Sequence, residues 1–128
     1  MRIAGIGCRK GVAVTDVLAA IDAALADNGL SRATLDALAT VPLKRNEPAL
    51  RDASDALGLA LLVPSQSETD AAAARTITRS AASQAVAGTP SASEAAALAA
   101  AGPNARLLGA RRIVGSVTCA IAVSEETP

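Results

Sequence analysis

No aromatic side chain and no histidine occur in this chain, whereas alanine occupies 33 of its 128 positions. The hydrophobic core must therefore be built from Leu, Ile, Val and Ala, and side chains this small fill a core only if the layers of secondary structure approach closely. A chain of this length can bury one such core. The composition predicts a single domain of thin, tightly stacked layers, which we expect to span residues 1–123, with residues 124–128 as a flexible tail.

The missing residue types exclude several classes of function. Without histidine there is no imidazole general base and no common transition-metal site, so we expect neither a metal nor a cofactor. Without aromatic side chains there is no platform on which nucleic-acid bases could stack. Twelve basic residues balance twelve acidic ones, so no global field attracts nucleic acid or membrane. We therefore expect neither as a partner.

The cysteine content and the hydropathy pattern favour a soluble cytoplasmic protein. Cys8 and Cys119 are the two cysteines of the chain, and two distant cysteines do not indicate a disulfide framework. No apolar run approaches the roughly 20 residues that a membrane-spanning helix needs.

Apolar runs that favour strands alternate along the chain with amphipathic helical patterns. Such alternation predicts an α/β fold with a mostly parallel sheet covered on both faces and an antiparallel C-terminal edge strand. The expected strands are residues 2–7, 34–40, 59–64, 106–112 and 117–123, and the expected helices are residues 16–28, 47–57 and 91–101, with one or two short helices within 65–87.

The stretch "GIGCRKG" at residues 5–11 places glycines, a cysteine and two cations at the end of the first strand. In sheets of this kind, ligands bind beyond the carboxyl ends of the strands. Glycines can turn backbone amides toward an anion, and cations beside a helix N-terminus add charge. The alternative is an ordinary tight turn with solvated cations. The residues expected at this edge are Gly7, Cys8, Arg9, Lys10, Gly11, Lys44, Arg45, Arg111 and Arg112.

Three side chains near this edge have both a chemical and a structural interpretation. Cys8 is a nucleophile if neighbouring cations lower its pKa, or a small residue packed under the loop. Lys44 and Glu47 divide binding and acid–base work, or form a surface ion pair at a helix start. Both alternatives stay open for each of these residues.

The segment "SASE" at residues 91–94 has the pattern of a capping box, in which Ser91 and Glu94 bind each other's backbone amides. The alternative is that the Glu94 carboxylate faces the ligand site and moves protons. Arg111 and Arg112 would lie on opposite faces if both are in a strand, so at most one of them reaches a ligand directly.

The ordered set "GIGCRKG", "LATVPLKRNEPAL", "LGLALLVP", "GTPSASEAAALAAAG" and "GSVTCAIAV" resembles the CobE and CbiG C-terminal domain family of cobalamin biosynthesis, most closely its stand-alone CobE members. The resemblance runs from residue 2 to about residue 123. It implies a three-layer α/β/α sandwich and a role in making the corrin ring.

The resemblance also implies a ligand, because corrin and precorrin intermediates carry several acetate and propionate carboxylates. The expected cations could hold these carboxylates by charge-assisted hydrogen bonds. Our first hypothesis is a carrier or accessory factor that binds such an intermediate and works with other enzymes of cobalamin biosynthesis. One alternative is a small hydrolase-like enzyme related to cobalt-precorrin-5A hydrolase, with Glu94, Lys44 or Cys8 as the catalytic group. The other is a structural subunit of a biosynthetic complex. Ligand-binding candidates are Gly7, Cys8, Arg9, Lys10, Gly11, Lys44, Glu47, Ser91, Glu94, Arg111 and Arg112.

Overall fold

The computed structural model describes residues 1–87 and 91–124. Residues 125–128 of the expected tail therefore lie outside the described residues. In chain order the elements are β1 (Arg2–Cys8), α1 (Val14–Asp27), the 3-10 turn η1 (Arg32–Thr34), β2 (Ala37–Ala39), η2 (Pro42–Lys44), α2 (Pro48–Leu57), β3 (Leu61–Leu62), α3 (Gln66–Ala72), η3 (Ala73–Arg75), α4 (Ala81–Ala87), α5 (Ala92–Ala101), β4 (Arg106–Leu107), β5 (Arg112–Val114) and β6 (Val117–Val123).

The strands form one sheet in the order β3-β2-β1-β6-β4, and β5 also pairs with β6. The pairs β1–β2 and β2–β3 are parallel, whereas β6 runs antiparallel to β1, β4 and β5. All three antiparallel pairs involve β6, so the other five strands point in the same direction. In this sense the mixed, mostly parallel α/β fold is confirmed, with an antiparallel C-terminal strand. That strand lies one position in from the edge, because β4 and β5 cover its outer side.

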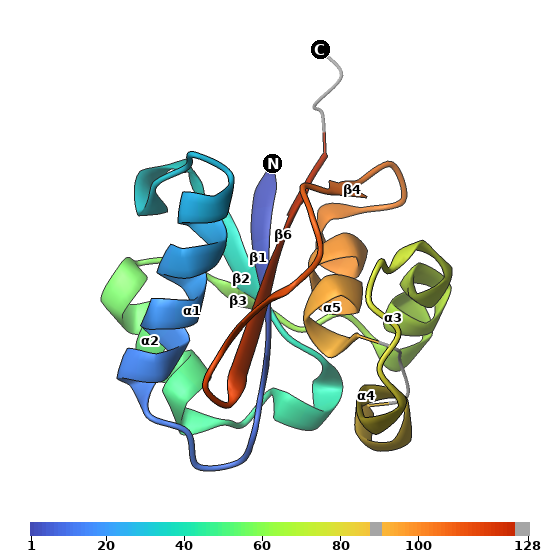
Figure 1. The fold of residues 1–128 in the computed structure, drawn as a ribbon, viewed down its shortest axis with the longest axis horizontal. Helices are drawn as coiled ribbons and strands as arrows, with labels where there is room; N and C mark the ends of the chain where they lie inside the picture. The colour runs from blue at the N-terminus through green and yellow to red at the C-terminus, as the bar shows by residue number, and fades with distance from the viewer. Residues whose placement is uncertain (88–90, 125–128) are drawn as a thin grey trace.

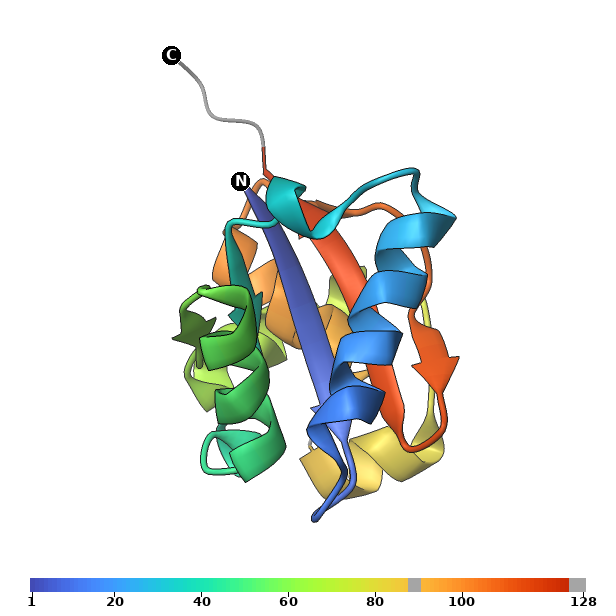
Figure 2. The same ribbon diagram turned by 90° about the vertical axis from the view of Figure 1, so that its left-hand side faces the viewer.

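Helices cover both faces of this sheet, which gives three layers (Figures 1 and 2). Helices α1 and α2 pack on one face, and α5, backed by α3, packs on the other. Even-numbered residues of β1, such as Ala4 and Ile6, belong to the core beneath α1. The odd-numbered residue Ile3 belongs to the core on the α5 side. This alternation is the ordinary period of a strand and decides which face each later residue occupies.

Helix α5 lies unusually close to β1, and the small side chains of both elements allow it. A β-carbon added to Gly5 would lie 2.0 Å from the Ser93 carbonyl oxygen and 2.7 Å from the Ala97 nitrogen. At Gly7 an added β-carbon would lie 2.8 Å from Thr118 Oγ1 and 3.6 Å from the Ala92 β-carbon. Gly5 is therefore required by the packing of α5 on β1, whereas the close contact at Gly7 is with a side chain of the neighbouring strand β6.

Several element boundaries differ from those expected from sequence. The strand expected at 34–40 shortens to Ala37–Ala39, because the chain forms the turn η1 just before it. The strand expected at 106–112 divides into β4 and β5. The hairpin β5–β6 is confirmed, and its turn begins at Gly115, whose φ of 59° favours glycine.

Candidate functional site

A cavity of about 250 Å³ opens where β1 ends, at the lower end of the sheet in Figure 1. We call it the cationic cavity, because Arg9, Lys44 and Arg111 line it from three separate segments. Among the described residues, its remaining lining is small, aliphatic or hydroxylic and includes no aspartate or glutamate: Gly7, Cys8, Val41, Leu43, Ser80, Ser83, Ala92, Ser116 and Thr118. The expectation that these three cations share one edge of the sheet agrees with this geometry.

No ion pair in the described part of the chain involves Arg9, Lys44 or Arg111. Arg112, the next residue after Arg111, is the cross-strand partner of Cys119, on the face of the sheet that α1 covers. Its guanidinium forms an ion pair with Asp27 at 2.7 Å. Arg112 therefore does not line the cavity. The expected strand holds only Arg112 of the two, since β5 begins there, and which of them reaches a ligand stays a prediction. Because these three cations have no ion-pair partner among the described residues, the cavity is a local concentration of positive charge.

A wider cavity of about 790 Å³ adjoins the first and shares Leu43 and Lys44 with it. We call it the outer cavity. Lys10 lines it, together with Gly11 and Glu47. Glu47 as a whole residue is 8 % exposed, and its Oε1 accepts a hydrogen bond from the Gly11 amide at 3.0 Å. No ion pair joins Lys44 and Glu47 among the described residues.

The backbone amides of the glycine loop are engaged within the protein at two positions. The Arg9 amide donates to the Ser116 carbonyl at 3.3 Å, and the Gly11 amide donates to Glu47. The prediction that loop amides bind an anion is therefore wrong for the amides of Arg9 and Gly11. Gly11 is required because its φ is 79°, a conformation that other residues rarely adopt. Positive charge at the site comes from side chains.

Glu94 does not form the expected capping box with Ser91. Ser91 is the N-cap of α5, but its side chain makes no capping hydrogen bond. The Glu94 carboxylate instead accepts hydrogen bonds from the Ile77 and Thr78 amides at 2.6 and 2.8 Å, from Thr78 Oγ1 at 2.5 Å and from the Arg111 amide at 2.9 Å. Four donors from two loops satisfy a buried carboxylate better than the single amide of a capping box.

The Glu94 carboxylate is fully buried and lines neither cavity. Burial disfavours its charged form, but the hydrogen bonds from Thr78, Arg111 and Ile77 together outweigh this effect and lower the pKa of Glu94. A buried carboxylate with both oxygens engaged in hydrogen bonds does not fit the acid–base alternative for Glu94. Its observed role is to hold the segment at Ile77 and Thr78, and the backbone of Arg111, against α5.

Cys8 also departs from the reactive interpretation. Burial raises the pKa of its thiol, Lys44 lowers it and Glu47 raises it, and the net direction is upward. Cys8 is therefore a protonated thiol near neutral pH. Cys119 is fully buried in the core, and burial raises its pKa to about 12.

Slow alkylation of Cys8 is the expected result of its raised pKa, because the thiolate is the reacting form. Folded protein should react with iodoacetamide more slowly than a free cysteine at pH 7, and the rate should climb with pH to a midpoint above the ordinary value for a thiol. Mass spectrometry of the Cys119→Ser variant isolates the Cys8 reaction, and urea-unfolded protein is the reference. Reaction at pH 7 as fast as in the unfolded chain would contradict the assignment.

Four hydroxyl side chains line the cationic cavity and were not predicted from sequence: Ser80, Ser83, Ser116 and Thr118. Ser83 Oγ accepts a hydrogen bond from the Ala92 amide at 3.1 Å, so it caps the start of α5 in place of Ser91. For Thr118 a sequence signal exists, because side chains alternate between the two faces along β6 and even-numbered residues of that strand face α5. No sequence pattern marks Ser80 or Ser83.

Two further observations concern the described residues only. These residues contain no cluster of three or more Cys, Asp or Glu side chains that could hold a metal ion. None of their helices combines the length and the apolar character needed to cross a membrane.

Comparison with known proteins places this geometry in a family. Residues 2–122 match the family model described as the cobalamin synthesis G C-terminus. The chain belongs to this family. Cobalamin biosynthesis is therefore the pathway in which it takes part, and the resemblance drawn from its motifs is confirmed.

Solved structures agree with this assignment. The chain is similar to the crystal structure of CobE, described as a protein from the cobalamin (vitamin B12) biosynthetic pathway, with a TM-score of 0.90, 36 % identity and coverage of 95 % of this chain and 89 % of that one. It is also similar to cobalamin biosynthesis protein chiG from Agrobacterium tumefaciens strain C58, with a TM-score of 0.78, 48 % identity and coverage of 98 % and 100 %.

A more distant likeness supports the fold alone. A cobalamin biosynthesis protein G homologue from Sulfolobus solfataricus is 22 % identical, with a TM-score of 0.70, and the match covers 97 % of this chain but 37 % of that one. A comparison with curated protein sequences gave no match.

Proposed function

We propose that this CbiG C-terminal family domain binds a polycarboxylated corrin precursor at the cationic cavity and acts as a carrier or accessory factor in cobalamin biosynthesis. The observation that carries the proposal is the lining of the cavity, where Arg9, Lys44 and Arg111 meet without a described carboxylate. Carboxylates on the rim of a tetrapyrrole would supply the counterions. Lys10, in the adjoining outer cavity, extends the positive charge.

Exposed aliphatic side chains near the cavity suit the face of a macrocycle. Leu43 lines both cavities and is 59 % exposed. Ile113 is also 59 % exposed and lies opposite Thr118 of the cavity wall. A cavity of about 250 Å³ is smaller than the pockets that enclose drug-sized ligands. Only the carboxylate-bearing edge of the ring would enter, while the ring face would lie on these side chains.

The carrier hypothesis is favoured over the hydrolase-like alternative. Glu94 is fully engaged in hydrogen bonds and Cys8 is protonated, which leaves Lys44 as the one available group among the three catalytic candidates.

A carrier must deliver its ligand, so other enzymes of the pathway are the proposed partners. We place this activity in the cytoplasm, where the two free cysteines would stay reduced.

The test is an absorbance titration of the purified protein with hydrogenobyrinic acid, followed by analysis of the released pigment. The chain has no Trp or Tyr, so the pigment dominates the spectrum. A saturable shift with unchanged pigment supports a carrier. A new product would establish the enzyme alternative, and the absence of any shift would favour the complex-subunit alternative.

Removal of the cavity cations should weaken this binding. Arg9→Ala, Lys44→Ala and Arg111→Ala each remove a charge-assisted hydrogen bond, typically worth about 1.5 to 3 kcal/mol, so Kd should rise about tenfold or more for each. Binding should also weaken as NaCl is added, because salt screens the charges.

The matched control is Arg112→Ala, which removes a neighbouring arginine on the opposite face of the sheet. Its Kd should equal that of the unaltered protein. Equal effects of Arg111→Ala and Arg112→Ala would remove the cationic cavity from the proposal even if binding itself were real.

A further inference from the structure

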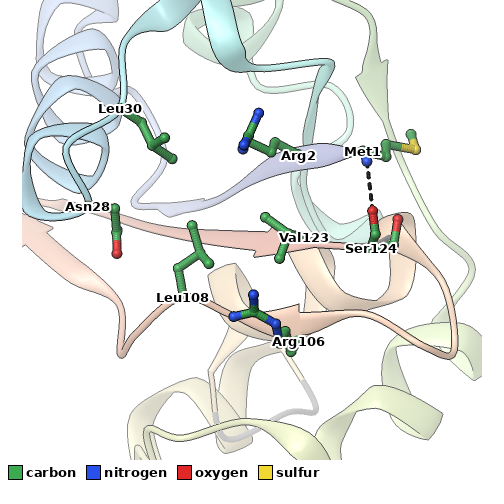
Figure 3. Close-up of a pocket in the computed structure, with 8 residues that line it drawn as sticks. All are labelled: Met1, Arg2, Asn28, Leu30, Arg106, Leu108, Val123 and Ser124. Atoms are coloured by element: carbon green, nitrogen blue, oxygen red, sulfur yellow. Dashed lines mark hydrogen bonds between the residues drawn. The ribbon is translucent and has the colours of Figure 1, made fainter. Parts of the chain in front are cut away.

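A second cavity, of about 420 Å³, lies at the opposite end of the sheet, where β1 begins and β6 ends (Figure 3). Its volume is within the range of small-molecule sites. Because β1 spans Arg2–Cys8, roughly 20 Å of strand separates this cavity from the cationic cavity. We call it the far cavity, lined by Met1, Arg2, Asn28, Leu30, Arg106, Leu108, Val123 and Ser124.

Strand register holds two arginines of the far cavity on the same face of the sheet. Arg2 lies opposite Val123 in the β1–β6 pair, and Arg106 lies opposite the same Val123 in the β4–β6 pair. Residues directly opposite share a face, and adjacent strands are about 4.8 Å apart, so the two arginine backbones are about 10 Å apart. Figure 3 shows the three residues on successive strands, with Val123 in the middle.

Among the residues that the structure describes, neither guanidinium has a partner. In the described part of the chain, no ion pair or side-chain hydrogen bond involves Arg2 or Arg106, and no aspartate or glutamate lines the cavity. The backbone amide of Arg2, in contrast to its side chain, donates a hydrogen bond to Asp36 Oδ2 at 2.7 Å. By contrast, Arg32 and Arg112 pair with aspartates at 2.8 and 2.7 Å. Within residues 1–87 and 91–124, the fold supplies counterions for those two arginines and none for Arg2 or Arg106.

One aliphatic side chain, that of Val123, lies between the two arginines. Two further aliphatic side chains, Leu108 and Leu30, also line the cavity. Asn28 adds one polar group, and its Nδ2 donates to the Ala24 carbonyl at 2.9 Å, which fixes the amide at the edge of the cavity. Two separated guanidinium groups with aliphatic side chains beside them match a ligand that has an anionic group at each end and a hydrocarbon chain between them.

We propose that the far cavity binds a small aliphatic dicarboxylate. Each carboxylate would meet one guanidinium, whose planar fork matches a carboxylate in two-pronged hydrogen bonding. The hydrocarbon spacer would lie over Val123 and Leu108. The site is separate from the proposed corrinoid site and does not depend on that function.

The test is an NMR titration of ¹⁵N-labelled protein with succinate, adipate and suberate, and with butyrate as the single-carboxylate control. Backbone amides of Arg2, Leu108 and Val123 and the Nε groups of Arg2 and Arg106 should shift and saturate. The affinity should depend on spacer length and exceed that for butyrate at least tenfold. The cavity cations Arg9, Lys44 and Arg111 should show smaller shifts.

The variants Arg2→Gln and Arg106→Gln should each weaken adipate binding at least tenfold, whereas Arg51→Gln, on the exposed side of α2, should not. Since Glu125 and Glu126 follow Ser124 in the sequence, the titrations are repeated in the Glu125→Gln, Glu126→Gln variant, where the same ranking is expected. Equal affinity for butyrate and dicarboxylates, indifference to either arginine, or binding of a Glu-rich peptide without binding of any dicarboxylate would overturn the proposal.

Discussion

Replacement of Gly5 by alanine is expected to lower the free energy of unfolding by about 3 kcal/mol or more, at the upper end of the usual cost of overpacking a core. The new β-carbon would lie 2.0 Å from the Ser93 carbonyl oxygen and 2.7 Å from the Ala97 nitrogen. Both are backbone atoms of α5, so no side-chain rotation relieves the clash. The helix would have to move away from β1 and lose its close packing. Urea unfolding followed by far-ultraviolet circular dichroism measures the effect.

Two other glycines provide graded controls for this result. Gly109→Ala should be nearly neutral, because nothing lies within 4 Å of an added β-carbon there. Gly7→Ala should have an intermediate effect, because its closest contact is the hydroxyl of Thr118, which can rotate. Equal unfolding free energies for Gly5→Ala and Gly109→Ala would show that α5 does not pack against β1 as described.

Replacement of Glu94 by alanine is expected to cost about 3 kcal/mol of unfolding free energy near neutral pH. The change leaves the amides of Ile77, Thr78 and Arg111 without their acceptor, and each buried unsatisfied donor costs about 1 to 3 kcal/mol, part of which water recovers. Glu94→Gln keeps the shape but turns an NH₂ group toward donors, so it should be destabilising as well. Thermal and urea unfolding of both variants measure the loss.

The lowered pKa of Glu94 gives this prediction a dependence on pH. A carboxyl whose pKa is lower in the folded than in the unfolded state binds its proton less readily when folded, so it stabilises the fold above its unfolded pKa. That contribution is lost as pH falls through the lower, folded pKa. The difference in stability between the unaltered protein and Glu94→Gln should therefore be largest near pH 7 and shrink below about pH 4.5.

Glu68 offers a matched control, because its pKa is also lowered but its carboxylate is exposed. Glu68 forms the capping box of α3 with Ser65, and Glu68→Gln should change stability only slightly. If Glu94→Gln behaves like Glu68→Gln at every pH, the four hydrogen bonds of Glu94 do not hold the two loops. Loss of hydrogenobyrinic acid binding in Glu94→Gln, with the fold retained, would identify Glu94 as a positioning residue for Arg111.

Much of the architecture follows from local patterns. The apolar runs at β1 and β6 and the helical periods of α1 and α2 are signals that a few neighbouring residues carry by themselves. The carboxyl ends of parallel strands lie at one edge, which brings Arg9 and Lys44 together. Arg112 begins β5 and lies opposite Cys119, whereas Arg111, just before the strand, lines the cationic cavity.

The functions of individual site residues were harder to predict. The spacing of Ser91 and Glu94 satisfies the capping-box pattern, yet the donors that engage Glu94 come from residues 77, 78 and 111, far away in the sequence. The thiol of Cys8 lies beside a cation, yet burial outweighs that charge. Both outcomes depend on which atoms surround a group in space, and local spacing does not contain that information.

The fold class, the two faces of each strand and the edge at which the cations gather can be read from the chain, because they depend on the period of its apolar residues and on its composition. The need for glycine at position 5, the partners of Glu94 and the absence of a partner for certain cations among the described residues follow only from the three-dimensional packing. These properties depend on distances between segments far apart in the sequence, and such distances are set when α5, β1 and the Arg111 loop pack together.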